Sequence, residues 1–196
     1  VEDPSRFQHI TRMTLGWTDI PTTRLARLFR DDSLIRLKFL DLEGCSYVTA
    51  AVERLLEMPS LQSLEEFRLG WNNIPVSGLK AFFASDDTLP KLKRFYFENN
   101  EIVNDEVKVI ADTKRLEQLS LLKLYNNDIN DTGLEAVVRS ASCRNLEFLD
   151  LSMNRLHNAS AKAIARSEHL NQLRTLDLDD NPGLKEEGWL ALMNSP

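Results

Sequence analysis

An eleven-residue pattern that recurs along the chain constrains its fold more than any other feature. The copy LEFLDLSMNRL spans residues 146–156, and six more copies begin at residues 10, 37, 64, 92, 119 and 173. Successive copies are therefore 27 or 28 residues apart. A fixed period of this length is typical of a solenoid, in which each repeat buries its apolar face against its neighbours. The sequence predicts one domain over residues 1–196, built from seven stacked repeats.

Each repeat divides into a strand and a helix. Counted from its first residue, a repeat has apolar side chains at positions 1, 4 and 6, and positions 4 and 6 have the spacing of a strand with one buried face. In the fifth repeat DTGLEAVVRSA follows, where Leu134, Val137 and Val138 mark one face of a helix. Two apolar helix columns recur: Leu25, Val52, Leu79, Val107, Leu134, Ala161 and Trp189, and then Leu28, Leu55, Phe82, Ile110, Val137, Ile164 and Leu192.

Position 9 of the repeat carries a column of asparagines. Its members are Asn72, Asn100, Asn127, Asn154 and Asn181, with Thr18 and Cys45 in the first two repeats. After a short strand the chain must turn inward, and this turn buries backbone groups that need partners. A side-chain amide offers both donors and an acceptor, so we expect the column to satisfy these groups and to be structural.

These residues resemble the leucine-rich repeat family, with its pattern LxxLxLxx(N/C)xL, over about Ile10 to Met193. The helix in each repeat is similar to that of the ribonuclease-inhibitor-like subclass. The resemblance implies an α/β solenoid curved like a horseshoe, with a parallel sheet on the concave face and helices on the convex face. Because the pattern describes a scaffold, the function must be argued from the side chains that the scaffold does not need.

Composition narrows the class of partner. The net charge of −6 argues against a nucleic-acid binder, which needs clustered Lys and Arg, and no apolar run is long enough for membrane insertion. Cys45 and Cys143 are far apart and are expected to be free buried thiols in a reducing compartment, which favours the cytoplasm. The first residue is Val, so we expect a processed chain or a fragment, and a secreted effector stays open.

No motif for catalysis, a cofactor or a metal is present in the sequence. His9, His157 and His169 lack HExxH or CxxC partners, and the phosphate-binding pattern GxxxxGK[ST] does not occur. An open strip of strands also offers no concave polar pocket for a nucleophile or a base. We therefore expect no enzyme and no cofactor.

The strand positions that point away from the core are free to bind. At positions 3, 5, 7 and 8 the repeat needs no large apolar or charged group, yet several occur. Aromatic residues and Arg dominate the energetics of protein interfaces. The predicted partner-binding residues are Trp17, Phe39, Arg68, Trp71, Arg94, Tyr96, Lys123, Tyr125, Phe148, Asp150 and Met153. Trp17 and Trp71 are the strongest candidates, because each follows a glycine that we expect to clear space beside it; the alternative is that some members pack flat on neighbouring strands.

An acidic group lies at the C-terminal end of the same strip. It consists of Asp150, Asp177, Asp179 and Asp180. These residues could receive a basic segment of a partner, or they could be a solvated acidic end. Calcium is a further possibility for carboxylates, although the spacing of an EF-hand is absent.

The sequence therefore predicts a protein–protein interaction module that binds a protein partner on its concave sheet. One alternative is a regulator of an enzyme in trans, like the repeat-built activators of the Ran GTPase, which resemble this chain but carry an acidic tail. Another is a structural spacer or a self-associating array, because neither end carries a clear cap.

Overall fold

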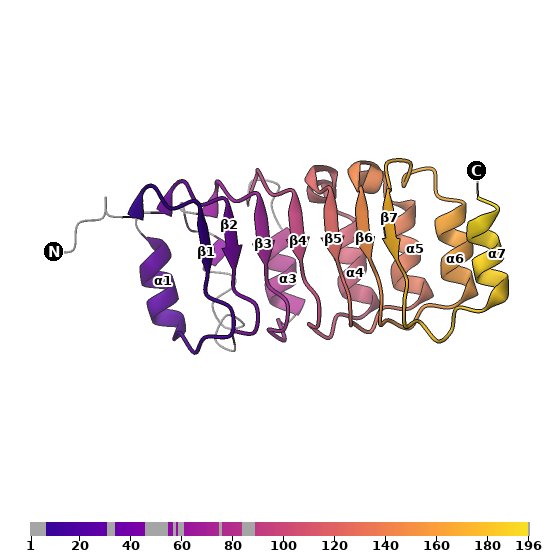
Figure 1. Ribbon diagram of the computed structural model, residues 1–196, viewed down its shortest axis with the longest axis horizontal. Coiled ribbons are helices and arrows are strands. Elements are labelled where there is room, and N and C mark those ends of the chain that lie inside the picture. Colours follow the sequence, from indigo (N-terminus) through magenta and orange to yellow (C-terminus); the bar gives the residue numbers. More distant parts are fainter. Residues whose placement is uncertain are drawn as a thin grey trace. The chain divides into compact units, whose positions relative to one another are not determined.

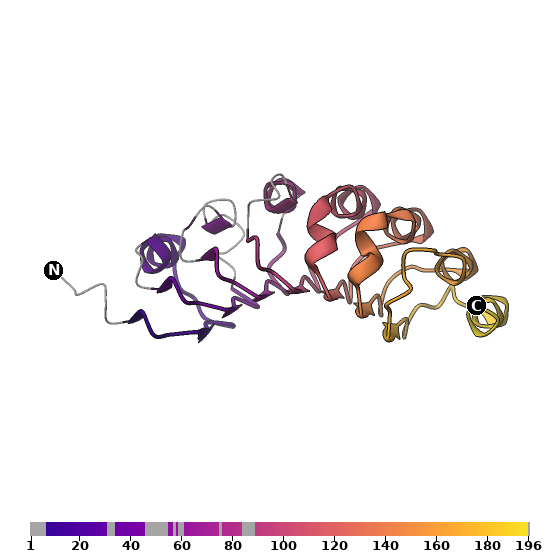
Figure 2. The ribbon, with the colours of Figure 1, turned by 90° about the horizontal axis from the view of Figure 1, so that it is seen from above.

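The computed structural model describes residues 7–30, 34–45, 55–56, 58, 61–74, 76–83 and 89–195. The chain divides into two compact units, residues 1–100 and 101–196. In each unit the strands form one layer and the helices form a second layer on one side of it (Figures 1 and 2). None of the helices in these described residues is long and apolar enough to span a membrane.

The first unit contains four parallel strands in chain order. They are β1 (Arg12–Thr14), β2 (Phe39–Asp41), β3 (Glu66–Arg68) and β4 (Arg94–Tyr96). Each strand pairs with the next in the register that the repeat predicts, so position 3 lies beside position 3. The helices are α1 (Thr22–Arg30) and α3 (Val76–Phe83).

The second unit repeats this arrangement. Its strands β5 (Leu121–Lys123), β6 (Phe148–Asp150) and β7 (Thr175–Asp177) are parallel and pair in order. Its helices are α4 (Asn104–Ala111), α5 (Asp131–Arg139), α6 (Asn158–Ala165) and α7 (Glu186–Met193). Two 3₁₀ helices, η4 (Lys114–Gln118) and η5 (Ala141–Asn145), precede β5 and β6.

The predicted apolar columns form the core. Leu149, Leu151, Leu134 and Val137 are fully buried between strands and helices. In the first unit the core is aromatic, and the rings of Phe82 and Phe95 stack with centroids 4.5 Å apart. The last member of the first helix column is an exception, because Trp189 is 44% exposed, and Val52 lies outside the described residues.

The asparagine column has the structural role that the sequence predicts. In Asn154, Nδ2 donates to the carbonyls of Leu124, Leu151 and Ser152 at 3.0–3.1 Å, and Oδ1 accepts the Ile129 N–H at 3.0 Å. These bonds join one repeat to the preceding one. Other members of the column bond in the same way, as at Asn127 and Asn181.

A cysteine takes this place in the second repeat. Cys45 is buried, and its thiol donates to the Leu15 carbonyl of the preceding repeat at 3.1 Å. Cys143 is also buried, and both cysteines are free, as predicted. The thiol of Cys45 therefore replaces the amide that bridges adjacent repeats elsewhere.

Candidate protein-binding face

The candidate site lies on the strand face turned away from the helices, which we call the open face. Its side chains come from positions 3, 5 and 7 of each repeat and from position 8, in the turn after the strand. Neighbouring strands are about 4.8 Å apart, so side chains at one position form a row across the repeats. The surface therefore depends on which side chains are neighbours in each row.

Some candidates that the sequence predicts to be exposed are in fact covered. Phe39 is only 5% exposed because the Arg12 guanidinium lies 3.7 Å from its ring centroid and Arg68 lies 5.3 Å from it. Asp150 is also only 5% exposed. The prediction of exposure is wrong for both residues, since arginines cover the Phe39 ring and Asp150 is bonded to Ser152 and paired with Lys123.

A buried carboxylate holds two of the candidate arginines in place. Glu66 Oε1 accepts from Arg68 Nη2 at 3.0 Å, and Oε2 accepts from Arg94 Nε at 2.8 Å. The Arg68 guanidinium also lies 4.5 Å from the ring centroid of Tyr96. Glu66 thus links strands β3 and β4 through their side chains, and the arginines are ordered parts of the face.

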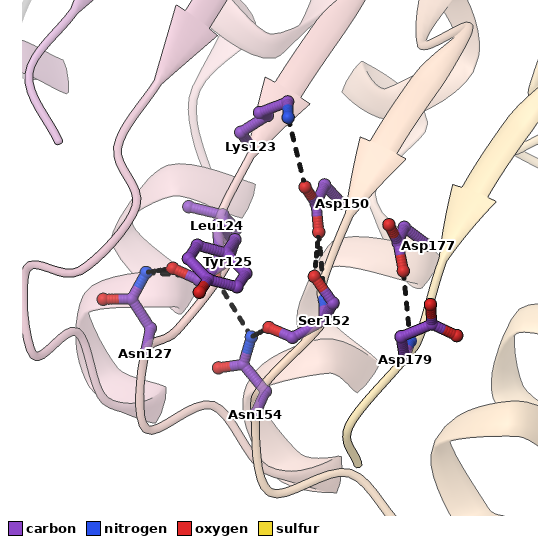
Figure 3. Close-up of polar contacts among 9 residues, drawn as sticks. All are labelled: Lys123, Leu124, Tyr125, Asn127, Asp150, Ser152, Asn154, Asp177 and Asp179. Atoms are coloured by element: carbon purple, nitrogen blue, oxygen red, sulfur yellow. Dashed lines mark hydrogen bonds and ion pairs between the residues drawn. The ribbon is translucent and has the colours of Figure 1, made fainter.

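A similar cluster lies on the open face of the second unit (Figure 3). Asp150 Oδ1 accepts the Ser152 hydroxyl at 2.6 Å and the Ser152 N–H at 3.1 Å, while Oδ2 lies 3.4 Å from Lys123 Nζ. Lys123 Nζ also lies 5.4 Å from the ring centroid of Phe148. Asp150 is therefore tied to its own turn and to the neighbouring strand.

Two of the acidic residues at the C-terminal end, Asp150 and Asp177, are register partners on the neighbouring strands β6 and β7. Asp177 Oδ1 accepts the Asp179 N–H at 3.1 Å (Figure 3). Asp150 makes the same hydrogen bond with the Ser152 N–H. Asp179 and Asp180 are exposed. Among the residues that the structure describes, no group of three or more His, Cys, Asp or Glu could hold a metal ion. A role in receiving a basic segment stays a prediction.

Position 8 has an unusual backbone throughout the chain. Each of its residues has a positive φ, between 50° and 64°: Trp17, Gly44, Trp71, Asn99, Asn126, Met153 and Asp180. Gly and Asn adopt this left-handed conformation readily, whereas a bulky side chain there is a rare and strained choice. The side chains are nonetheless large and exposed at Trp17 (68%), Trp71 (42%) and Met153 (40%).

The two tryptophans meet above a glycine. Their ring centroids are 5.9 Å apart with an interplanar angle of 50°, although one repeat lies between them. That repeat has Gly44 at position 8, where an added Cβ would lie 2.6 Å from the Trp17 ring. The prediction that the preceding glycine clears this space is wrong. A Cβ at Gly16 would instead meet Asp41, and one at Gly70 would meet Glu98.

Sequence reasoning missed two acidic residues beside this pair. Glu43 precedes Gly44, and its carbonyl accepts the Trp17 N–H at 2.7 Å. Asp41 Oδ1 accepts the Glu43 N–H at 3.0 Å. Burial and the neighbouring Asp41 raise the pKa of Glu43, while Arg68 lowers it. Comparing rows across the first three repeats would have found Glu43, because Gly and Glu alternate at position 7 where Trp and Gly alternate at position 8.

A second surface lies at the end of the second unit. A cavity of about 1030 Å³ is lined by residues of β7 and α7, among them Trp189 and Met193, and by Leu178 directly after β7. Trp189, Leu190 and Met193 are exposed. This is the side of the last described repeat on which a further repeat would stack.

The comparisons with known proteins agree with the fold. The leucine-rich repeat family model matches residues 60–83, 119–138 and 142–165, which fall on the third, fifth and sixth predicted repeats. The search of curated proteins found no match to this chain. The subclass, the count of seven repeats and the horseshoe curvature stay predictions. With the parallel strands and covering helices of both units, the matches show that this chain contains leucine-rich repeats and has the α/β solenoid fold of such proteins.

Proposed function

We propose that the chain is a protein-interaction module that binds a protein partner through its open face. Leucine-rich repeats are generally a binding fold, and solenoids present extended surfaces suited to this use. We expect no catalytic activity. The two free, buried cysteines support a reducing compartment such as the cytoplasm.

The exposed pair Trp17 and Trp71 carries this proposal. Both side chains occupy left-handed backbone, where a bulky residue costs roughly 1–2 kcal/mol. Their exposure means that part of each ring makes no contact within the chain, and the packing that remains is offset by this strain. Exposed aromatic groups on a strained but ordered backbone support a role outside the fold, and Trp is among the residues that most often dominate interfaces.

The rest of the open face supports an ordered binding surface. Arg68 and Arg94 are held by Glu66, and Lys123 is held by Asp150. Side chains fixed in this way lose little conformational entropy on binding, so a partner would meet a preorganised surface.

The test is an affinity capture with two variants. Trp17→Asn/Trp71→Asn removes both rings and keeps a residue type that position 8 already contains at Asn99 and Asn126. Trp189→Leu serves as the matched control, since it removes an exposed tryptophan from α7. We expect the double variant to lose a protein that the native chain and Trp189→Leu both retain. Identical capture by all three chains would contradict the proposal.

Self-association is a second candidate, favoured by the cavity at this end and by the exposed apolar side chains of Trp189 and Met193. A copy stacked on this end would bury these side chains. In that case light scattering of the same samples would show a mass that rises with concentration, and Trp189→Leu would change it more than the double variant. A role as the regulator of an enzyme in trans stays a prediction, and no feature of the described residues favours it.

A further inference from the structure

We propose that Trp17, Trp71, Asp41 and Glu43 together bind a cationic side chain, Lys or Arg, of the protein partner. This inference rests on the proposed function and specifies its chemistry. The four residues lie on the open face of the first unit, at the ends of strands β1 to β3 and in the turns that follow them.

The tryptophan pair provides two aromatic faces. The rings are tilted by 50° with centroids 5.9 Å apart, and they are exposed at the surface. The face of an indole ring carries negative electrostatic potential and attracts ammonium and guanidinium groups more strongly than other aromatic rings do. Two tilted rings side by side therefore favour a cation over an anion.

Two carboxylates stand next to the rings. Gly44 underlies the Trp17 ring, and Glu43 is bonded to Gly44. Asp41 lies beside Gly16, the residue before Trp17, because a Cβ at Gly16 would be 3.1 Å from Asp41 Oδ1. Positions 5, 7 and 8 thus place negative charge and aromatic faces together over the same three repeats.

Within the part of the chain that the structure describes, Arg68 attracts these carboxylates only from beyond ion-pair distance. Neither Asp41 nor Glu43 forms an ion pair there, whereas Glu66, Asp150 and Glu65 each do. The nearest arginine, Arg68, donates its hydrogen bonds to Glu66. The carboxylates beside the tryptophans therefore lack the direct ion pairs that Glu66 makes at β3 and β4.

The pKa of Glu43 agrees with this placement. Burial and the adjacent Asp41 raise it more than Arg68 lowers it, so the ionised carboxylate is less stable here than in water. A bound Lys or Arg would relieve that repulsion. Binding of the cation should therefore weaken as the pH falls through the raised pKa of Glu43, because protonation removes the charge.

The test uses the three tryptophan indoles as reporters on the whole chain. The Nε1–H signals of Trp17, Trp71 and Trp189 are followed by NMR while Nα-acetyl-lysine methylamide, Nα-acetyl-arginine methylamide or the neutral Nα-acetyl-norleucine methylamide is added at matched ionic strength. We expect both cationic probes to shift Trp17 and Trp71 and to leave Trp189 unchanged. Equal shifts with norleucine, or no shift with any probe, would overturn the inference.

Charge variants complete the experiment. Glu43→Gln should lower the affinity of the lysine probe roughly two- to fivefold and remove its dependence on pH near the Glu43 pKa. Glu65→Gln is the matched control, since it makes the same change in the same unit, where Glu65 pairs with Lys38. Equal effects of the two variants would contradict a local role for Glu43.

The two proposals fail in different ways. If Trp17→Asn/Trp71→Asn abolishes partner capture while Glu43→Gln leaves it intact, the face binds a protein but not through a cation. If the double variant leaves capture unchanged, the proposed function itself is wrong.

Discussion

At the scale of single residues, position 8 contains both residues that suit its backbone conformation and residues that do not. Every member has a positive φ, and Asn99, Asn126 and Gly44 suit that backbone. Trp17 and Trp71 do not suit it. The sequence shows that tryptophans stand at these positions, but it does not show that their backbone is strained. The turn geometry that imposes a positive φ appears only when the chain is folded.

The asparagine column gives a stability prediction at the same scale. Asn154→Ala should lower the free energy of unfolding by about 2–4 kcal/mol, because it leaves buried groups such as the Leu124 carbonyl and the Ile129 N–H without their partner. Asn171→Ala, at an exposed site in the same unit, should change it by less than about 0.5 kcal/mol. Denaturant unfolding measures both, and equal losses would refute the structural role of Asn154.

At the scale of elements, the sequence predicted the strands and helices well, because each depends on a period within one repeat. The strand β6 and the helix α5 lie where LEFLDL and DTGLEAVVRSA predict them. The 3₁₀ helices η4 and η5 were not predicted, since they have no apolar period of their own. The contacts that cover Phe39 and Asp150 were not predicted residue by residue, because Arg12 and Lys123 belong to the preceding repeat.

The element η5 carries a prediction about pH. Burial raises the pKa of the Cys143 thiol from 9.0 to about 12, and its Sγ donates to the Val137 carbonyl. In the unfolded chain the thiol ionises near pH 9.0, so the stabilisation from the neutral thiol is complete below pH 9.0. It is lost as the pH rises from there to about 12, by roughly 1.4 kcal/mol per pH unit.

The measurement compares the native chain with Cys143→Ala across this pH range. The difference between their free energies of unfolding should stay constant below pH 9.0. Above pH 9.0 the free energy of unfolding of the native chain should fall relative to that of Cys143→Ala. Other groups titrate in both chains, so their contributions cancel. A difference that does not change with pH would show that Cys143 is not held as a buried neutral thiol.

At the scale of the whole molecule, the repeat period carries most of the information. Seven copies of one pattern predicted parallel strands, covering helices and a buried asparagine column, and the described residues of both units have them. The period says nothing about the open face, because a solenoid needs only its stacked core. The repeat pattern also does not predict the division into two units after Asn100. The single domain over residues 1–196 stays a prediction.

The most direct test of this account asks whether the tryptophans belong to the fold. Trp17→Asn/Trp71→Asn and Leu69→Ala are compared by equilibrium denaturation; Leu69 lies two residues before Trp71 and is fully buried. We predict a change of less than about 1 kcal/mol for the double variant, since relief of backbone strain offsets the lost ring contact, and a loss of about 2–5 kcal/mol for Leu69→Ala. If the double variant loses as much stability as Leu69→Ala, the tryptophans are part of the core and the open face is not the binding surface.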